Sequence, residues 1–318
     1  MRIHSLKAFI LAITVLILPL VSHHNTAAGK NSIVQGQVIY TNSLNGNIDY
    51  CHCKDNPNGG LVKRATAIKT LREKNGDLLL CSTGDLFTYN PDPVLAGFIV
   101  KSLDHIDYDA ICPGDQEMTV GTDSLLQYSN TLPFICANLQ VCHKGKWISP
   151  GKKFTVVQKN NIKYGITGII HPSVFRYYSK EIKNNTRITS PGLALKKAIA
   201  SLTDRRVDCI LLLSHSGISY DRKLAKTHSE IDIIIGGHSQ TLVSPPEKVG
   251  NTIIVQAGAG GARIGILDIT VKNGNITRYS NRFIRPDEHQ PADDPRIREL
   301  IQQYHEKVSD KYKGLRFD

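Results

Sequence analysis

Two short apolar segments, each ending at a histidine close to glycine, most constrain how this chain can fold. Residues 211–217 read LLLSHSG and residues 233–240 read IIIGGHSQ, with a polar, helix-compatible stretch at 219–229 between them. This order predicts strand, helix, strand, with His215 and His238 at the carboxyl ends of neighbouring parallel strands. Open α/β sheets bind their ligands at that edge. We therefore expect both histidines to face a ligand.

The rest of the chain alternates in a similar way. Apolar and β-branched segments predict strands at 32–41, 77–82, 108–112, 133–137, 153–158, 163–170, 252–256, 263–271 and 276–284. Helical spacing predicts helices at 61–74, 92–106, 123–131, 191–204 and 295–312. Strands that alternate with helices and then give way to hairpins indicate a layered α/β domain with a mixed sheet or two packed sheets.

The N-terminus has the pattern of a secretory signal. Basic residues precede a nearly continuous apolar segment at 8–21, and small polar residues follow it up to Ala28. We predict a signal peptide at 1–28, a single domain at 29–285, and a helical extension at 286–318 that packs on the domain or trails from it. The product would be exported to a periplasm or the extracellular space. The apolar segment is shorter than the roughly 20 residues of a membrane span, so membrane attachment is expected only if it stays uncleaved.

Composition limits the classes of partner. Of the 318 residues, 41% are apolar, enough for one large core. The formal net charge of +11 falls by two, to +9, when Arg2 and Lys7 leave with the signal peptide. A basic surface attracts small anions such as phosphate esters. Because the sequence contains no arginine-rich run and no basic stripe interleaved with aromatics, we do not expect nucleic acid as a partner.

Metal-ligating side chains follow four of the predicted strands. Asp85 and Asp115 each follow one strand, His215 ends a third, and His238 and Gln240 follow a fourth. Carboxylates and imidazoles are ligands for hard or borderline divalent ions, and strand ends fix their geometry. The order and spacing therefore predict a metal site at this edge of the sheet.

Several motifs together resemble a known family. They are TNxxxG at 41–46, GD at 84–85, PGxxE at 113–117, SH at 214–215 and GGHSQ at 236–240. In this order they resemble the 5′-nucleotidase branch of the calcineurin-like metallophosphoesterases, over residues 33–268. The resemblance implies a four-layer α/β/β/α sandwich with two metals at the strand ends, where a metal-bound water or hydroxide attacks phosphorus.

The chain departs from the family at the first metal. Where the family motif has the metal-binding aspartate and histidine of NDxHG, this sequence has Ser43 and Asn45, which are weak neutral oxygen donors. We therefore expect one divalent ion (zinc, manganese, iron or calcium) rather than two. The ligands that the resemblance implies for that ion are Asp85, Asp115, His215 and His238, with Gln240 nearby.

The catalytic position also differs. The resemblance places a catalytic histidine where this sequence has Gln116, and an amide cannot carry a proton. Loss of general acid–base help typically lowers the rate about 10²–10⁴-fold, although Glu117 could substitute. We predict a weak or altered hydrolase acting on a small anionic or phosphorylated substrate. Exported members of the family carry a further C-terminal domain that stacks the nucleobase; after Ile284 only one helix is predicted here, so nucleotide specificity is not inferred.

Cys51-His52-Cys53 is the most distinctive local motif. Two cysteines flanking a histidine near a strand end can bind a soft metal, form a strained disulfide or act as a redox pair; they can equally be ordinary surface cysteines. The motif also resembles a less characterised bacterial branch of 5′-nucleotidase-like proteins, some with selenocysteine in this loop. The alternatives are therefore a thiol-redox or soft-metal protein using Cys51 and Cys53, with a redox partner, or a catalytically dead binding module.

Overall fold

The computed structural model describes residues 33–49, 60–286 and 292–312, with side chains described up to residue 309. The predicted signal peptide at 1–28 and the cysteines Cys51 and Cys53 lie outside the described residues. The predictions made for them therefore stay predictions.

Two large sheets form the centre of the described structure. The first has the order β14-β13-β1-β2-β3 and the second the order β11-β12-β10-β9-β7-β6. The first sheet consists of β1 (Ile33–Thr41), β2 (Leu79–Ser82), β3 (Ala110–Ile111), β13 (Ile264–Lys272) and β14 (Asn275–Ile284). Strands β1, β2 and β3 pair in parallel, β13 pairs antiparallel with β1, and β14 pairs antiparallel with β13. The second sheet consists of β6 (Phe154–Lys159), β7 (Ile162–Ile170), β9 (Cys209–His215), β10 (Ile233–Gly236), β11 (Glu247–Val249) and β12 (Thr252–Val255). Its four central strands pair in parallel, and the edge strands β6 and β11 pair antiparallel with their neighbours.

Strand β9 shows why the histidine strands are apolar throughout. Leu211 and Leu213 belong to the large core shared by the two sheets, whereas Ile210 and Leu212 point the other way, into a second apolar cluster. That second cluster is covered by α5 (Pro191–Asp204) and α6 (Ile218–Thr227). A strand buried on both faces has no polar side to alternate with, so its sequence is a continuous apolar run.

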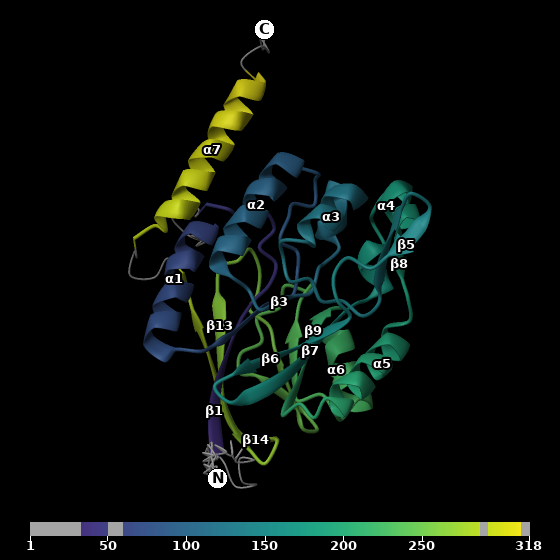
Figure 1. Cartoon of the computed structure of the whole chain (residues 1–318), viewed down its shortest axis with the longest axis vertical. Helices are drawn as coiled ribbons and strands as arrows, with labels where there is room; N and C mark the ends of the chain where they lie inside the picture. Colours follow the sequence, from purple (N-terminus) through teal and green to yellow (C-terminus); the bar gives the residue numbers. More distant parts are fainter. Residues whose placement is uncertain (1–32, 50–59, 287–291, 313–318) are drawn as a thin grey trace, which may run out of the picture.

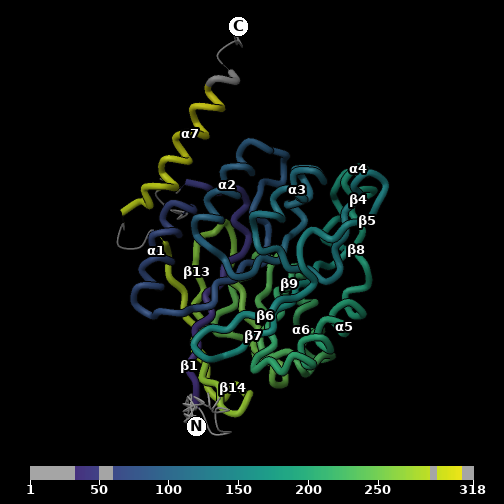
Figure 2. The backbone as a smooth tube through the Cα atoms, viewed as in Figure 1, coloured from purple at the N-terminus to yellow at the C-terminus, as the bar shows by residue number. Residues whose placement is uncertain are grey.

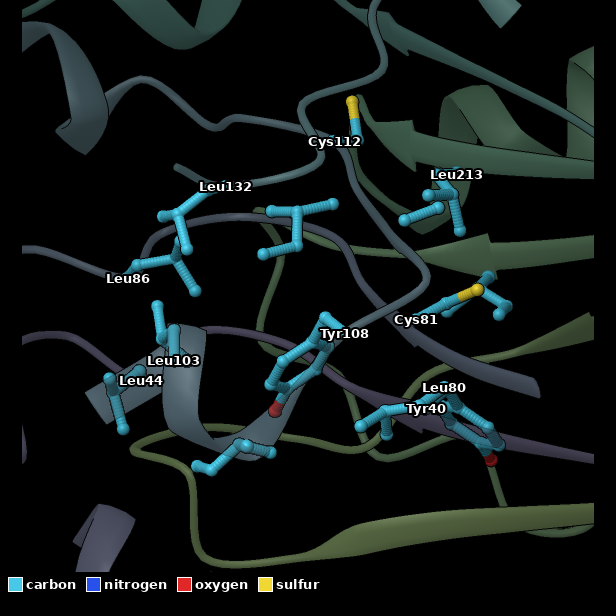
Figure 3. Close-up of a cluster of buried hydrophobic side chains, with 14 of the residues drawn as sticks. Tyr40, Leu44, Leu80, Cys81, Leu86, Leu103, Tyr108, Cys112, Leu132 and Leu213 are labelled. Carbon is cyan, nitrogen blue, oxygen red and sulfur yellow. The ribbon is translucent and has the colours of Figure 1, made fainter. Parts of the chain in front are cut away.

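Helices cover the outer face of the first sheet as well. These are α1 (Gly60–Asn75) and α2 (Pro93–Ile106), whose buried residues join the large core (Figure 1). In Figure 3, Leu103 of α2, Leu80 of β2 and Leu213 of β9 lie in one apolar cluster, although they come from three different layers. The predicted four-layer α/β/β/α sandwich is confirmed.

Local signals fixed several element boundaries. Pro93 and Pro191 begin their helices directly after capping residues, and the Asp92 carboxylate accepts a hydrogen bond from Leu95 N at 2.9 Å. The hairpin of β6 and β7 turns at Asn160-Asn161, where both residues have positive φ. The predicted helices at 191–204 and 295–312 match α5 and α7 (Pro295–Tyr312).

The prediction of a strand at 133–137 is wrong. This segment makes only isolated bridges, Ile111 to Phe134 and Ile135 to Lys152, and its apolar side chains are buried. Burial alone produced the strand-like pattern. A third small sheet and four short helices complete the described elements: β4 (Leu139–His143), β5 (Lys146–Ile148), β8 (Thr186–Ile188), η1 (Gln116–Val120), α3 (Thr122–Tyr128), η2 (Pro172–Phe175) and α4 (Lys180–Asn185).

Helix α7 packs on the domain through its first turns. Ile297, Leu300 and Ile301 are buried in the large core, and the ring of Tyr304 lies 5.8 Å from that of Phe98 in α2. The following turns extend beyond the other helices, at the end of the molecule opposite to the start of β1 (Figures 1 and 2). Within the described ranges, none of the helices has the length and apolar character that crossing a membrane requires.

Candidate metal centre

Four ligating side chains converge from both sheets. Asp85, Asp115, His215 and His238 each offer one ligand atom, and these atoms all lie within 4.8 Å of one another. We call these residues the four-residue cluster. His215 Nε2 lies 2.9 Å from Asp115 Oδ1 and 3.3 Å from Asp85 Oδ1, and His238 Nδ1 lies 3.2 Å from Asp115 Oδ1. The carboxyl end of β9 and the loops after β2, β3 and β10 therefore meet at one point, as the strand-end spacing predicted.

Glycines allow the loops to approach this closely. A Cβ atom on Gly114 would lie 2.6 Å from both Asp85 Oδ1 and His215 Cε1. On Gly237 it would lie 2.6 Å from the Thr83 carbonyl oxygen. Any side chain at either position would push the ligands apart, which gives a packing reason for glycine next to the metal-ligating residues.

The orientation of His215 is fixed by a carbonyl group. Its Nδ1 lies 2.6 Å from the carbonyl oxygen of Thr83, so this nitrogen carries a proton and donates it. Nε2 then faces the two aspartates. A hydrogen bond of this kind, on the far nitrogen of a histidine, is typical of metal-ligating imidazoles.

The charges of the cluster favour a cation between its carboxylates. Burial alone would lower the pKa of His215, but the carboxylates of Asp85 and Asp115 outweigh it and raise that pKa well above its ordinary value. Burial likewise would raise the pKa of Asp115, yet hydrogen bonds from His215 and His238 hold it below its ordinary value. In the metal-free protein the raised pKa of His215 favours a positively charged imidazole between the two carboxylates.

A divalent ion fits the same place. Among the described residues, the buried Asp85 Oδ1 has no hydrogen-bond partner, and His215 already presents Nε2 to it. Two carboxylates and two imidazole nitrogens form a donor set that suits zinc, manganese or iron. The residues present thus match a metal ion in charge and donor chemistry.

The buried carboxylate of Glu117 connects the two loops that carry Asp85 and Asp115. Its side chain is 0% exposed and accepts hydrogen bonds from the backbone N–H groups of Leu86 at 2.6 Å, Gly114 at 2.5 Å and Asp85 at 3.2 Å. Burial, with a contribution from the Asp85 carboxylate, raises the pKa of Glu117 to about 7. This placement favours a structural role that ties together the two aspartate loops; catalysis by Glu117 stays a prediction.

The positions that replace the first metal site are engaged with neighbouring residues. Ser43 is fully buried, and its Oγ accepts a hydrogen bond from Asn42 Nδ2 at 3.2 Å. Asn45 Oδ1 accepts one from Gln116 Nε2 at 3.1 Å. Gln240 is exposed and lines a surface pocket with Asn45 and Gln116. Neutral amides therefore lie beside the cluster where a second ion would need charged ligands.

Tyr178 escaped the sequence analysis, and the contacts of Asn42, a residue of the TNxxxG motif, were not predicted. Tyr178 donates a hydrogen bond from its hydroxyl group to Asp115 Oδ2 at 2.7 Å. It lies in an irregular segment between η2 and α4, where no local pattern marks it. Asn42 joins the two sheets, accepting a hydrogen bond from Ala257 N at 2.8 Å and donating one to Gly258 O at 2.5 Å. Its place directly after the first strand was a signal that could have found it.

A four-layer sandwich with two carboxylates and two histidines at its strand ends is the arrangement found in the metallophosphoesterase fold. The chain is 25% identical over 296 residues to a 5′-nucleotidase of Diplobatis ommata, covering 79% of this chain and 48% of that one. The 5′-nucleotidase precursor of Thermus thermophilus matches with a TM-score of 0.77 at 21% identity, over 88% of this chain and 60% of that one. The calcineurin-like phosphoesterase YfkN of Bacillus subtilis matches with a TM-score of 0.74 at 18% identity, over 88% of this chain and 99% of that structure.

These comparisons agree with the motifs. The chain is similar in sequence to 5′-nucleotidases and shares its fold with a calcineurin-like phosphoesterase, which supports the resemblance to that branch. It spans about half the length of the 5′-nucleotidase relative, 48%. A search against family models found no match.

Proposed function

We propose that this protein is an exported, metal-dependent phosphate-ester hydrolase with one principal metal site. Asp85, Asp115, His215 and His238 would hold a zinc, manganese, iron or calcium ion. The observation that carries the proposal is the convergence of these four ligand atoms, from four strand ends, to within 4.8 Å. Residues 29–285 would form the catalytic domain, with 1–28 as the signal peptide and 286–318 as a helical extension.

The chain's own residues would orient the ligands and leave one side open. A divalent ion in such a site polarises a phosphoryl oxygen and acidifies water. Tyr178 and His215 hold Asp115 by hydrogen bonds at 2.7 and 2.9 Å. The side chain of His215 is 0% exposed, whereas that of His238 is 37% exposed. A small phosphate ester would therefore approach from the side of His238.

We further propose that hydrolysis is weak. Gln116 is bonded to Asn45 and offers no titratable proton, and Glu117 is buried against three N–H groups. Without a general acid or base the rate falls about 10²–10⁴-fold, or about 3–5 kcal/mol in the barrier. Neutral Ser43 and Asn45 leave the chain without the charged ligands that the family resemblance implies for a second ion.

Metal content and activity measured on the same samples test the proposal. The wild-type protein, reconstituted with zinc or manganese and desalted, should retain about one ion per chain and hydrolyse 4-nitrophenyl phosphate slowly. His238→Ala should lose both the ion and the activity. His228→Ala is the matched control, because this histidine lies at the end of α6 and its side chain is hydrogen-bonded only to that of Thr227 among the described residues. Equal metal content in the two variants would contradict the assignment.

The thiol alternative rests on Cys51 and Cys53, which lie outside the described residues. It predicts a cysteine pair that cycles between dithiol and disulfide, or that binds copper, in a protein without detectable phosphatase activity. A positive phosphatase assay that requires His238 favours the hydrolase.

A further inference from the structure

Two buried cysteines contact each other close to the four-residue cluster. Cys112 directly follows β3, and Cys136 lies in the irregular segment 133–137 that runs alongside it. The backbone holds the two segments together, because the N–H group of Ile135 donates to the carbonyl oxygen of Ile111 at 2.8 Å. The two side chains, 0% and 2% exposed, are hydrogen-bonded through their thiol groups. We call Cys112 and Cys136 the thiol pair.

The surroundings of Cys136 stabilise its thiolate. Burial would raise the pKa of Cys136, but hydrogen bonds from the Cys112 thiol and from the N–H groups of Asn138 and Leu139 hold that pKa below its ordinary value. In its neutral form the same thiol donates only a weak hydrogen bond, to Asn138 Oδ1 at 3.5 Å. Because the thiolate is the reactive form of cysteine, an oxidant would attack Cys136 first.

Cys112 is connected to residues of the four-residue cluster. Its sulfur accepts a hydrogen bond from the backbone N–H group of His215, and Asp115 follows three positions later in the chain. The intervening Gly114 has no free space around it, since a Cβ atom there would lie 2.6 Å from both Asp85 Oδ1 and His215 Cε1. A displacement of Cys112 would therefore move Asp115 and His215 relative to each other.

A free cysteine in an apolar core is usually an inert small hydrophobe. Cys81 and Cys209 fit that description, because burial raises the pKa of each thiol well above its ordinary value. In Cys136 the hydrogen bonds outweigh burial, and a second thiol lies in contact with it. The thiol pair thus has the nucleophile and the resolving thiol that an internal disulfide requires.

A small oxidant has a route to Cys136. The next two residues, Ala137 and Asn138, line a surface pocket of about 470 Å³. Segment 133–137 is joined to its neighbours by isolated bridges rather than by a continuous ladder, and such segments open locally more readily than core strands. Hydrogen peroxide, which is little larger than water, would therefore reach the sulfur of Cys136 from this side.

We infer that Cys112 and Cys136 form a reversible disulfide when a hydroperoxide oxidises the protein, and that this bond weakens metal binding at the four-residue cluster. The Cys136 thiolate attacks the O–O bond of hydrogen peroxide, which leaves a sulfenic acid on Cys136 and releases hydroxide. The sulfur of Cys112 loses its proton and displaces the hydroxyl group of the sulfenic acid as water. Over both steps, two thiols and one hydrogen peroxide give one disulfide and two waters.

The new bond would disturb the metal-ligating residues through Cys112. A covalent bond draws two sulfurs closer than a contact between thiols does, so Cys112 would move toward segment 133–137 and away from the N–H group of His215. Asp115, three positions along a chain without free space at Gly114, would follow. The effect on metal binding rests on the proposed metal site, whereas the disulfide itself does not.

Peptide mapping tests the disulfide. The reduced, zinc-free protein is treated with hydrogen peroxide and desalted, its remaining thiols are alkylated in urea, and the chain is cleaved after glutamate. Cleavage after Glu117 separates Cys112 from Cys136, so the disulfide should give one linked pair of peptides that dithiothreitol splits. Cys112→Ser and Cys136→Ser should each abolish the linked pair. Cys142→Ser, which removes a partly exposed thiol, should keep it.

Competition with a chromophoric chelator measures the effect on metal binding, with zinc as the probe because it has no redox chemistry of its own. Oxidation should lower the zinc affinity of the wild-type protein about tenfold, and reduction followed by desalting should restore it. Cys136→Ser should bind zinc equally with and without peroxide treatment. The double variant Cys51→Ser/Cys53→Ser should respond like the wild-type protein, which separates the thiol pair from the cysteines of the alternative function.

The outcomes distinguish this inference from the proposed function. Thiols at Cys112 and Cys136 that both stay open to alkylation after peroxide treatment would overturn the inference, as would a zinc affinity that is equal in the two redox states. Zinc binding and phosphatase activity without linked peptides would refute the disulfide and retain the hydrolase. Linked peptides in a protein that binds zinc in neither state would refute the proposed function and retain the disulfide. Cys112→Ala repeats the test if Cys136→Ser proves unstable by circular dichroism.

Discussion

His215 Nδ1 lies 2.6 Å from the carbonyl oxygen of Thr83, across the junction of the two sheets. Thr83 follows β2 in the first sheet, and His215 ends β9 in the second. The Thr83 hydroxyl group also donates to the carbonyl oxygen of Gly236, at the end of β10, at 2.9 Å. One threonine thus sets the tautomer of a candidate metal-ligating histidine and fixes the relative position of the strand ends.

Tyr178 should tune metal affinity without being a ligand. Tyr178→Phe removes the hydrogen bond to Asp115 Oδ2 and keeps the ring. Loss of such an outer contact typically lowers metal affinity about 10–100-fold. Competition with a chromophoric chelator measures the change, and Tyr177→Phe is the control, because that side chain is 81% exposed. Equal affinities in the two variants would show that Asp115 does not depend on Tyr178.

Gln256 should stabilise the turn that carries His238 and thereby support metal binding. It is 0% exposed, and with its amide oxygen facing the turn it accepts hydrogen bonds from the N–H groups of Gln240 at 3.1 Å and Thr241 at 3.2 Å. His238 and Gln240 both have positive φ, a conformation that needs such support. Gln256→Leu should lower metal affinity at least about tenfold, and Gln256→Glu, which keeps an acceptor, should restore most of it. If both variants bind metal with the affinity of the wild-type protein, the conformation of the turn does not depend on Gln256.

Asp232 should make stability depend on pH. Burial raises the pKa of its carboxyl group to about 6, although the N–H group of Ile210 donates to it at 2.7 Å. Because the folded state holds this proton more tightly than the unfolded state, its contribution to stability is fully present below about pH 4. It is lost as the pH rises through about 6. Asp232→Asn removes this loss, so above pH 6 the variant should gain on the order of 2 kcal/mol relative to the wild-type protein.

Urea unfolding at pH 4 and pH 7 measures this difference. The exposed Glu230→Gln controls for the loss of one negative charge. A constant difference between Asp232→Asn and the wild-type protein across this range would contradict the account.

Restoring the missing proton carrier should raise activity. Gln116→His places an imidazole where the family resemblance implies one, and general acid–base catalysis typically contributes about 10²–10⁴-fold. We expect kcat for 4-nitrophenyl phosphate to rise at least about tenfold, with a new pH dependence near the pKa of histidine. Gln240→His, at another residue that lines the same surface pocket, is the matched control. No increase would show that something other than the lost histidine limits the rate.

Much of the fold follows from local sequence. Helices α5 and α7 were predicted at their observed bounds, because proline at the first helical position and helical spacing are local signals. Asp115 and His215 were expected to converge from their places at strand ends, and they do, although β3 belongs to the first sheet and β9 to the second, so the contact also depends on how the two sheets pack.

What the sequence did not reveal depends on distant contacts. Tyr178 reaches Asp115 across 63 positions of the chain, and nothing in its neighbourhood marks that contact. The buried state of Glu117 depends on three N–H groups from two other loops. Residues 133–137 were misassigned because an apolar segment buried between other elements has the same pattern as a buried strand.

The central claim is that one divalent ion is held by Asp85, Asp115, His215 and His238. Anomalous diffraction from crystals of the protein grown with manganese or zinc tests it most directly. The account predicts a single strong peak enclosed by the carboxylate oxygens and imidazole nitrogens of these four residues. A second peak of equal height beside Ser43 and Asn45, or no peak among the four residues, would contradict it.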